Sequence, residues 1–347
     1  MKEPLYQRAL AWLRGGFLGA VVLYAVWPWL PYVHGGARPR TIVFYGFSSL
    51  GEAFQESIFP AFARRWQAQT GERVEFISAF GGSGTITNQI IMGVPAQVAL
   101  LSLELDAERL ARAKVIAPGS WRALPHGGVV NRTPFVILVR PGNPLRIRDF
   151  ADLTRPGVRV VHPDPLTSGA ATWALLAEYG AAVRSDRRNP RAGHDLLLGL
   201  WRNVVAQSSS ARGARTQFDN GFGDALVTYE QELLYDQARG RLHGEIVYPR
   251  STVLSEHTLV LVPQRTKAAD RPLVRAFVDF VFSEHAQRLF VEHGFRSVLP
   301  ELDQSRRPPF VAIADPFGAR DYGGWPHIKR EIVDTLWRQQ VLKELGR

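Results

Sequence analysis

The feature that most restricts the fold of this chain is a repeated alternation of β-rich apolar runs with helical stretches. Residues 41–45 are typical of a buried strand, and a helical stretch then extends to about residue 70. Further β-rich runs follow at 74–77 and 97–101, with an apolar helix through residue 91 between them. An order of strand, helix and strand predicts α/β layers on a largely parallel sheet.

The same alternation continues along the rest of the chain. A long β-rich run at 133–139 is followed by a strand at 158–161 and a helix predicted over 170–179, with Gly180 as its C-cap. The remaining expected elements are strands at 224–229 and 257–262, helices near 272–283 and 284–294, and an amphipathic helix at 328–345.

Small clusters of serine and glycine stand at four of the transitions from strand to helix. They are Phe47-Ser48-Ser49, Gly82-Ser83-Gly84, Ser168-Gly169-Ala170 and Ser210-Ala211. A helix start exposes unpaired N–H groups and a partial positive charge, serine adds a hydroxyl donor, and glycine allows close approach. A single such serine is usually only an N-cap. Four starts that converge on one cleft, at the carboxyl ends of strands, predict an anion site built without Lys or Arg.

The first 39 residues form a separate segment. Lys2, Arg8 and Arg14 precede an apolar run of about 19 residues at 15–33, and small residues follow it. A basic start, an apolar stretch and small residues indicate export, so the N-terminus stays in the cytoplasm and the rest lies outside. The run is also near the length that spans a bilayer. Residues 1–39 are therefore predicted to be a signal peptide, cleaved after Ala37, or an uncleaved signal anchor.

Composition excludes several classes of function. The chain has no cysteine, which rules out disulfides, thiolate metal sites and a cysteine nucleophile. Its formal charge of +10 is scattered, without a basic stripe interleaved with aromatics, which argues against nucleic acid. The run 81–85 lacks the last glycine of a nucleophile elbow, and His126 and His162 are expected to be loop or core residues. We expect no enzyme activity, cofactor or metal.

Five segments together resemble the sulfate/thiosulfate-binding proteins of ABC transporters. In order they are 81–84, 139–144, 164–170, 211–213 and 223–230. The likeness extends over roughly residues 40 to 340, including Phe317-Gly318 and Gly323-Gly324-Trp325.

The resemblance implies a periplasmic-binding-protein type II fold, with two mixed sheets flanked by helices and joined by a two-strand hinge. Lobe I would comprise 40–132 and 262–347, and lobe II 133–261, with the hinge near 133–138 and 251–261. The anion would lie in the cleft between the lobes, and its contacts with both would favour hinge closure.

The family holds sulfate through neutral donors only, and the resemblance carries those donors to seven positions. They are the N–H of Gly46, the hydroxyl of Ser83, the hydroxyl and N–H of Ser168, the N–H groups of Gly169, Ala170 and Ala211, and the side chain of Tyr229. Gly46 replaces the family's aspartate and Ala170 its glycine, which matters little for backbone contacts. Tyr229 stands where the family has a tryptophan indole donor, and molybdate-binding relatives use a tyrosine there.

We therefore expect an extracytoplasmic, monomeric protein that captures sulfate or thiosulfate and delivers it to an ABC permease. Phosphate is disfavoured because it needs an acceptor for its proton, and no Asp or Glu falls within 80–85, 167–172 or 208–216. Arg212 and Arg215 are expected in ion pairs rather than on the anion. A molybdate- or tungstate-binding protein of the same fold, and a membrane-tethered oxyanion sensor or accessory protein, remain the alternatives.

Overall fold

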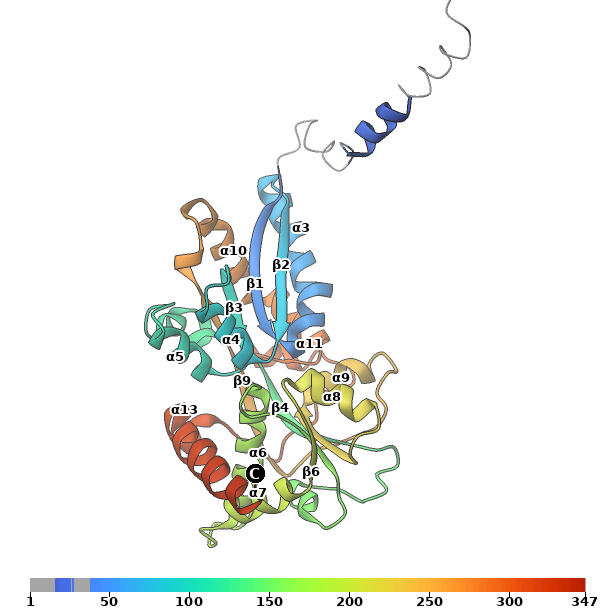
Figure 1. The fold of residues 1–347 in the computed structure, drawn as a ribbon, viewed down its shortest axis with the longest axis vertical. Coiled ribbons are helices and arrows are strands. Elements are labelled where there is room, and N and C mark those ends of the chain that lie inside the picture. Colours follow the sequence, from blue (N-terminus) through green and yellow to red (C-terminus); the bar gives the residue numbers. More distant parts are fainter. Residues whose placement is uncertain (1–15, 26, 28–37, 347) are drawn as a thin grey trace, which may run out of the picture. The chain divides into compact units, whose positions relative to one another are not determined.

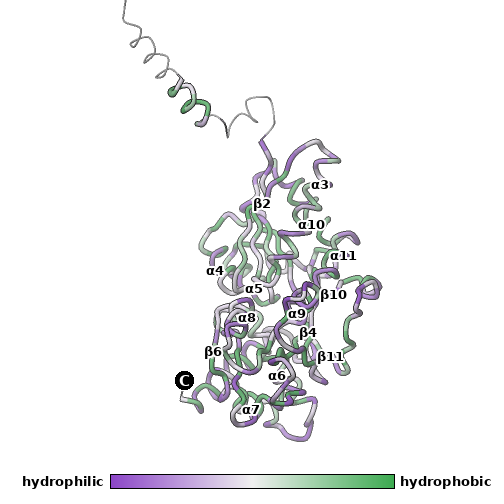
Figure 2. The backbone as a smooth tube through the Cα atoms, turned by 90° about the vertical axis from the view of Figure 1, so that its right-hand side faces the viewer, coloured by the Kyte–Doolittle hydropathy of each residue, from purple (hydrophilic) through white to green (hydrophobic). Residues whose placement is uncertain are grey.

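The computed structural model describes residues 16–25, 27 and 38–346, which form two compact units. The smaller unit takes in the described part of residues 1–41 together with 63–75. In it, Glu72 pairs with Arg40 at 3.4 Å and accepts a hydrogen bond from the Trp66 indole at 3.1 Å. Residues 16–25 form an exposed helix that is largely hydrophobic (Figure 2). Most of the predicted signal segment lies outside the described residues, so its cleavage stays a prediction.

A mixed sheet runs through the larger unit, which comprises 42–62 and the described part of 76–347. The strand order is β2-β1-β3-β9-β4-β7-β5-β6, with β8 and β10 beside β4 and β11 beside β9. The strands are β1 Arg40–Phe47, β2 Val74–Gly81, β3 Val98–Leu101, β4 Val129–Val139, β5 Val160–Pro163, β6 Val204–Ser208, β7 Ala225–Tyr229, β8 Glu245–Val247, β9 Ser251–Leu261, β10 Arg296–Ser297 and β11 Asp315–Phe317. The predicted α/β class is confirmed.

Two long antiparallel strands, β4 and β9, connect two groups of parallel strands (Figure 1). β1 pairs parallel with β3 in one group, and β5 pairs parallel with β6 and β7 in the other. β3, β5 and β7 are buried along their whole length, as expected for strands covered by helices on both faces.

The longer helices alternate with these strands along the chain. They are α3 Phe59–Thr70, α4 Ser83–Ile91, α5 Glu104–Arg112, α6 Gly169–Ser185, α7 Ala192–Arg202, α8 Ala211–Asp219, α9 Glu230–Gln237, α10 Arg271–Val281, α11 Glu284–Glu292 and η10 Ile328–Val341. Shorter helical turns are η2 Ser48–Leu50, η3 Ala53–Ile58, η4 Ser120–Ala123, η5 Pro125–Gly128, η6 Phe150–Thr154, η7 Pro263–Arg265, η8 Ala268–Asp270, α12 Pro300–Asp303, η9 Ala319–Tyr322, α13 Gly324–His327 and α14 Leu342–Glu344. Within the larger unit, we call β1, β3, η2, η3, α4, α5, α10 and α11 the first lobe. We call β5 to β8 and α6 to α9 the second lobe.

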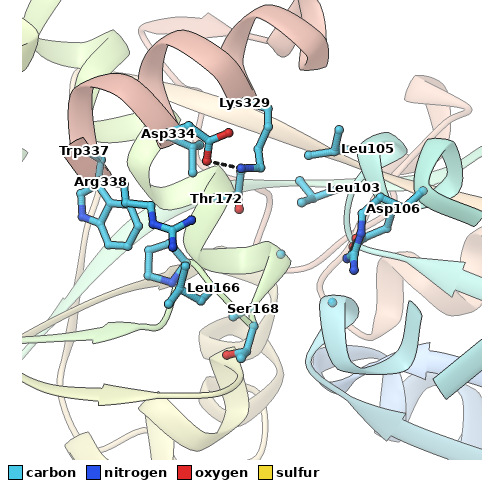
Figure 3. A pocket seen from close by; sticks show the side chains of 16 residues that line it. Leu103, Leu105, Asp106, Leu166, Ser168, Thr172, Lys329, Asp334, Trp337 and Arg338 are labelled. Atoms are coloured by element: carbon cyan, nitrogen blue, oxygen red, sulfur yellow. Dashed lines mark hydrogen bonds and ion pairs between the residues drawn. The ribbon is translucent and has the colours of Figure 1, made fainter. Parts of the chain in front are cut away.

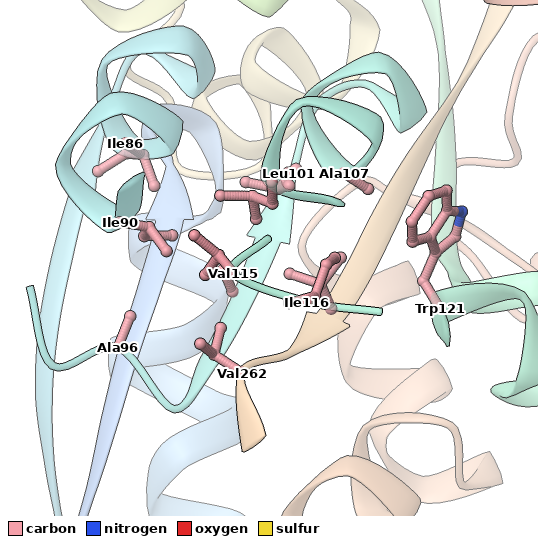
Figure 4. Packing of buried hydrophobic residues seen from close by; sticks show 12 residues of the cluster. Ile86, Ile90, Ala96, Leu101, Ala107, Val115, Ile116, Trp121 and Val262 are labelled. Carbon is pink, nitrogen blue, oxygen red and sulfur yellow. The ribbon is translucent and has the colours of Figure 1, made fainter. Parts of the chain in front are cut away.

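An apolar cluster fixes α4 and α5 against β3 in the first lobe (Figure 4). Ile86 and Ile90 of α4 pack there with Leu101 of β3 and Val262, and each is at most 2% exposed. Full burial of such a side chain contributes about 1.5–3 kcal/mol. The cluster therefore holds the starts of α4 and α5 firmly at the end of β3, where the predicted anion site lies.

The C-terminal helix of the chain packs mainly on helices of the second lobe. This helix forms as expected, η10 packs against α6 and α7, and the short α13 before it contacts α5. Trp337 meets Trp201 with ring centroids 4.9 Å apart, and Trp325 meets Trp173 at 4.5 Å. The apolar face that made this helix amphipathic is thus buried on helices of the second lobe.

Gly180 also plays another part than the one predicted. It does not end a helix, because α6 continues to Ser185. A Cβ at Gly180 would lie 2.4 Å from Cζ of Phe317, so only glycine lets β11 approach α6 this closely. The prediction of a C-cap at this residue is wrong, because tertiary packing and not a helix end requires the glycine.

Candidate functional site

The predicted donors lie at the carboxyl ends of two sets of parallel strands. In the first lobe, Gly46 of β1 is in register with Leu100 of β3, so both strands end side by side. In the second lobe, the chain leaves β5, β6 and β7 just before Ser168, at Ser208 and at Tyr229. Ligands of α/β proteins bind at such edges.

Close backbone contacts bring the two edges together. A Cβ at Gly82 would lie 2.4 Å from the carbonyl oxygen of Ser209 and 2.8 Å from that of Thr167. A Cβ at Gly169 would lie 2.8 Å from Oγ of Ser102 and 3.1 Å from Cβ of Ser83. Both glycines are therefore needed for close approach, and the predicted residues Ser83 and Gly169 are direct neighbours.

Ser83 is buried, and its hydroxyl both donates and accepts a hydrogen bond within the protein. It donates to Oδ2 of Asp106 at 2.7 Å and accepts from the N–H of Ser102 at 3.0 Å. Arg109 donates to the other oxygen of Asp106 at 2.9 Å. Burial raises the pKa of Asp106 above its ordinary value, although the bonds from Ser83 and Arg109 oppose this. The Ser83 hydroxyl hydrogen, which the family resemblance assigns to the bound anion, therefore points to the Asp106 carboxylate.

Tyr229 lies at the end of β7 and is fully buried. Its hydroxyl oxygen is 2.8 Å from Oγ of Ser102. Burial raises the pKa of Tyr229, partly opposed by the bond to Ser102, so the phenol keeps its proton at neutral pH. Ser102 therefore links the predicted residues Ser83, Gly169 and Tyr229.

The start of α6 presents N–H groups to this region. The N–H of Ser168 donates to the carbonyl of Asp164 at 2.8 Å, which leaves its hydroxyl as the available donor. Gly169 and Ala170 occupy the first turn, where N–H groups have no acceptor within the helix. The Trp173 indole donates to the carbonyl of Ser102 at 2.7 Å and ties α6 to the end of β3.

Gly46 is paired with Leu100 near the end of β1, and Ala211 is the first residue of α8. A Cβ at Gly46 would lie 3.0 Å from the rings of Phe44 and Phe80, which accounts for a glycine there. Ala211 begins α8, and η2 of the first lobe packs against this helix. Gly46 thus lies one residue before the end of β1, and Ala211 lies in the first turn of a helix, where N–H groups have no acceptor within the helix.

Charged side chains connect the lobes beside the start of α8. Arg212 donates to both carboxylate oxygens of Glu52, at 2.7 Å for the Nη2–Oε2 pair. Arg212 also lies 3.6 Å from Glu232, which accepts from the Ser49 hydroxyl at 2.7 Å. Arg215 pairs with Asp219 within the second lobe. The expectation that both arginines form ion pairs is confirmed.

A cavity of about 280 Å³ lies beside Ser168 and Gly169 (Figure 3). It is lined by α5, by the segment 165–172 and by η10. Figure 3 shows Lys329 paired with Asp334 and, further along the same helix, Arg338. Arg109 lines the opposite wall. Two carboxylates, Asp106 and Asp334, line the same cavity and pair with Arg109 and Lys329, so much of its charge is balanced.

The histidines near the site are structural, as expected. His162 is buried in β5, with Nε2 3.0 Å from Glu178 and Nδ1 2.6 Å from the carbonyl of Pro163. His126 is exposed in η5. Among the described residues, no three His, Cys, Asp or Glu side chains are grouped to hold a metal. No helix in the described part of the chain is long and apolar enough to cross a membrane.

The fold and the site define a class of protein. The chain matches the bacterial extracellular solute-binding proteins over residues 52–296, and it belongs to this family. Within that class, a sulfate-binding protein of Synechococcus elongatus is 32% identical over 309 residues, which cover 88% of each chain. A sulfate-binding protein of Escherichia coli is 31% identical over 78% of this chain and 83% of its own.

A solved structure agrees with this assignment. The sulfate-binding protein SubI from Mycobacterium tuberculosis is 31% identical, with a TM-score of 0.77, and the match covers 85% of this chain and 100% of that one. The type II periplasmic-binding-protein fold implied by the sequence is therefore confirmed.

Proposed function

We propose that this protein captures sulfate, or thiosulfate, between its two lobes outside the cytoplasm and delivers it to an ABC permease. The observation that carries the proposal is the meeting of neutral donors from both lobes around Ser102, with helix starts directed at the same region. The names of the relatives described above support the choice of ligand. The proposed role is binding without catalysis, by a monomer.

Neutral donors suit a fully ionised oxyanion. Hydrogen bonds from neutral groups to an anion contribute about 1.5–3 kcal/mol each, and the starts of α6 and α8 add partial positive charge. A buried cationic side chain is then unnecessary, and a carboxylate facing the anion would repel it. We propose that the seven predicted residues, Gly46, Ser83, Ser168, Gly169, Ala170, Ala211 and Tyr229, surround the ligand, with the donation from Ser83 dependent on the state of Asp106.

Capture is proposed to follow a hinge motion about β4 and β9. The anion contacts both lobes, so it stabilises the closed form over the open form. The pairs Arg212–Glu52 and Ser49–Glu232 also cross between the lobes and add to closure. We propose boundaries of 40–132 with 262–314 for one moving body and 133–261 with 315–346 for the other, because the tail packs on α6 and α7.

A molybdate- or tungstate-binding protein is the second candidate. It is favoured by the tyrosine at position 229, whose hydroxyl lies 2.8 Å from Ser102. A phenol both donates and accepts, whereas an indole only donates. The larger oxyanions have the same tetrahedral geometry, so the same groups could serve them.

The test is calorimetry on residues 38–347 with sulfate, thiosulfate, molybdate, tungstate and phosphate. Tight one-to-one binding of sulfate or thiosulfate is the expected result. Preference for molybdate or tungstate would move the assignment to the second candidate. No heat with any of the five, and no shift in thermal unfolding, would overturn the oxyanion proposal.

A further inference from the structure

Ser102 occupies the centre of the candidate site although neither the sequence pattern nor the family resemblance points to it. It follows β3 directly, at the same edge as Gly46, and is 1% exposed. Its N–H donates to Ser83 and its carbonyl accepts from Trp173. Its hydroxyl contacts Tyr229 and the position of Gly169 in the second lobe. Its backbone is thus fixed, and only the hydroxyl is free to serve a ligand.

The hydrogen bond between the hydroxyls of Ser102 and Tyr229 uses only one of their two hydrogens. Two hydroxyls have two hydrogens, and the contact at 2.8 Å uses one of them. Among residues 38–346, neither hydroxyl has another hydrogen-bond partner. One hydrogen therefore remains for a ligand at the junction of the lobes.

Ser83 cannot supply the same hydrogen while it donates to Asp106. The phenol is the more acidic of the two remaining hydroxyls, so it is the better donor to Ser102. A hydroxyl that accepts a hydrogen bond becomes a stronger donor itself. The Ser102 hydroxyl also lies directly against the start of α6, because glycine at 169 leaves room for it.

We propose that Ser102 is an additional oxyanion-binding residue, whose hydroxyl donates to the anion and is supported by the Tyr229 phenol. This inference rests on the proposed function and identifies a specificity-determining group of that same site. It makes Tyr229 a positioning residue rather than a direct ligand.

The experiment compares sulfate affinity in Ser102→Ala, Tyr229→Phe and the double variant by calorimetry on residues 38–347. Loss of a neutral donor to a charged group corresponds to about a 10- to 100-fold weaker affinity for Ser102→Ala. Tyr229→Phe removes only the support and should weaken binding a few-fold. In the Ser102→Ala background, Tyr229→Phe should have almost no further effect, because the supported hydroxyl is already absent.

A matched control is Ser297→Ala, which removes another buried serine hydroxyl, one that donates to Gln287 instead. It should keep wild-type affinity for sulfate. If Ser102→Ala unfolds, Ser102→Cys replaces the hydroxyl with a slightly larger thiol that donates only weakly, and it should lose affinity in the same way.

Three outcomes would contradict either the proposed role of Ser102 or the proposed function. Wild type that binds sulfate, with Ser102→Ala within twofold of it, overturns the role of Ser102 and leaves the proposed function intact. A large loss in Tyr229→Phe with little loss in Ser102→Ala makes the phenol the direct ligand and also overturns the inference. Wild type that binds no oxyanion overturns the proposed function itself.

Discussion

The ion pair between Glu52 and Arg212 joins the lobes, and the substitution Glu52→Gln tests whether it holds the closed form. Burial raises the pKa of Glu52, but the bond and charge of Arg212 outweigh this and lower it below the ordinary value, so the pair is ionised at neutral pH. The Glu52 and Arg212 side chains are 24% and 41% exposed. The exposure of this ion pair is therefore intermediate. Fully exposed pairs contribute about 0.2–1 kcal/mol, and disruption of a buried pair costs about 3–5 kcal/mol.

An intermediate value of about 1–2 kcal/mol is therefore reasonable, which corresponds to roughly 5- to 30-fold weaker sulfate binding. The full factor appears if the ligand-free protein is mostly open, because the pair then forms only on closure. Glu52 is preferred to Arg212 as the site of change, since removing the arginine would also leave Glu232 without its cation.

The assay is calorimetry with sulfate at two salt concentrations, because a partly exposed ion pair is screened by salt. Glu284→Gln is the matched control. It removes the same charge from a pair with Arg288 that lies within one helix of the first lobe. Equal sulfate affinity for Glu52→Gln and Glu284→Gln would refute the idea that this pair contributes to closure.

Three further predictions follow from burial and close contacts. Gly82→Ala adds a methyl group 2.4 Å from the carbonyl of Ser209, so calorimetry should show sulfate binding at least about 10-fold weaker than in the wild type. The control Gly318→Ala meets no atom within 4 Å and should bind sulfate as the wild type does. Burial lowers the pKa of His257 to about 3, so the unfolded chain takes up a proton below pH 6.5 that the folded chain refuses. Between pH 7 and pH 5 this group should remove about 2 kcal/mol from the free energy of unfolding, and a urea titration of His257→Gln should lack that part of the slope. Gly180→Ala forces a methyl group against Phe317 and should lower the free energy of unfolding by about 1–3 kcal/mol; unchanged stability in urea would contradict the packing of β11 on α6.

Local apolar pattern was enough to predict the buried strands but not their full extent. β3 and β7 were found because all their residues are buried and mostly apolar. β4 begins at Val129, before the predicted start at 133. In this additional part of the strand, Asn131 is paired with His257 of β9. These two polar side chains bond to each other at 2.6 Å, so they can be buried inside strands without an apolar signature.

Some residues of the candidate site could be predicted from local sequence, whereas others are brought there only by tertiary packing. The clusters that contain Ser83, Ser168 and Ala211 were predicted to form an anion site because serine and small residues at a helix start are a local pattern. Ser102 has no such signal, since it is a single serine after an apolar run. Asp106 resembles an ordinary acidic residue in the first turn of a helix. Only the packing of α4 and α5 on β3 brings these two residues to Ser83.

Asp106 changes the physical basis on which we expect phosphate to be excluded. The sequence suggests that no carboxylate is near the anion, yet this one lies 2.7 Å from the Ser83 hydroxyl. Ser83 and Arg109 donate to its two oxygens, and Asp106 also lines the cavity beside Ser168. The acceptor that a protonated anion would meet is Oγ of Ser83, which already accepts from Ser102 and has one lone pair left. The expected discrimination against phosphate then depends on whether the proton of phosphate can reach that lone pair. If the Ser83 hydrogen turned from Asp106 toward the ligand, Ser83 would donate to the anion instead of accepting its proton, which favours a fully ionised anion.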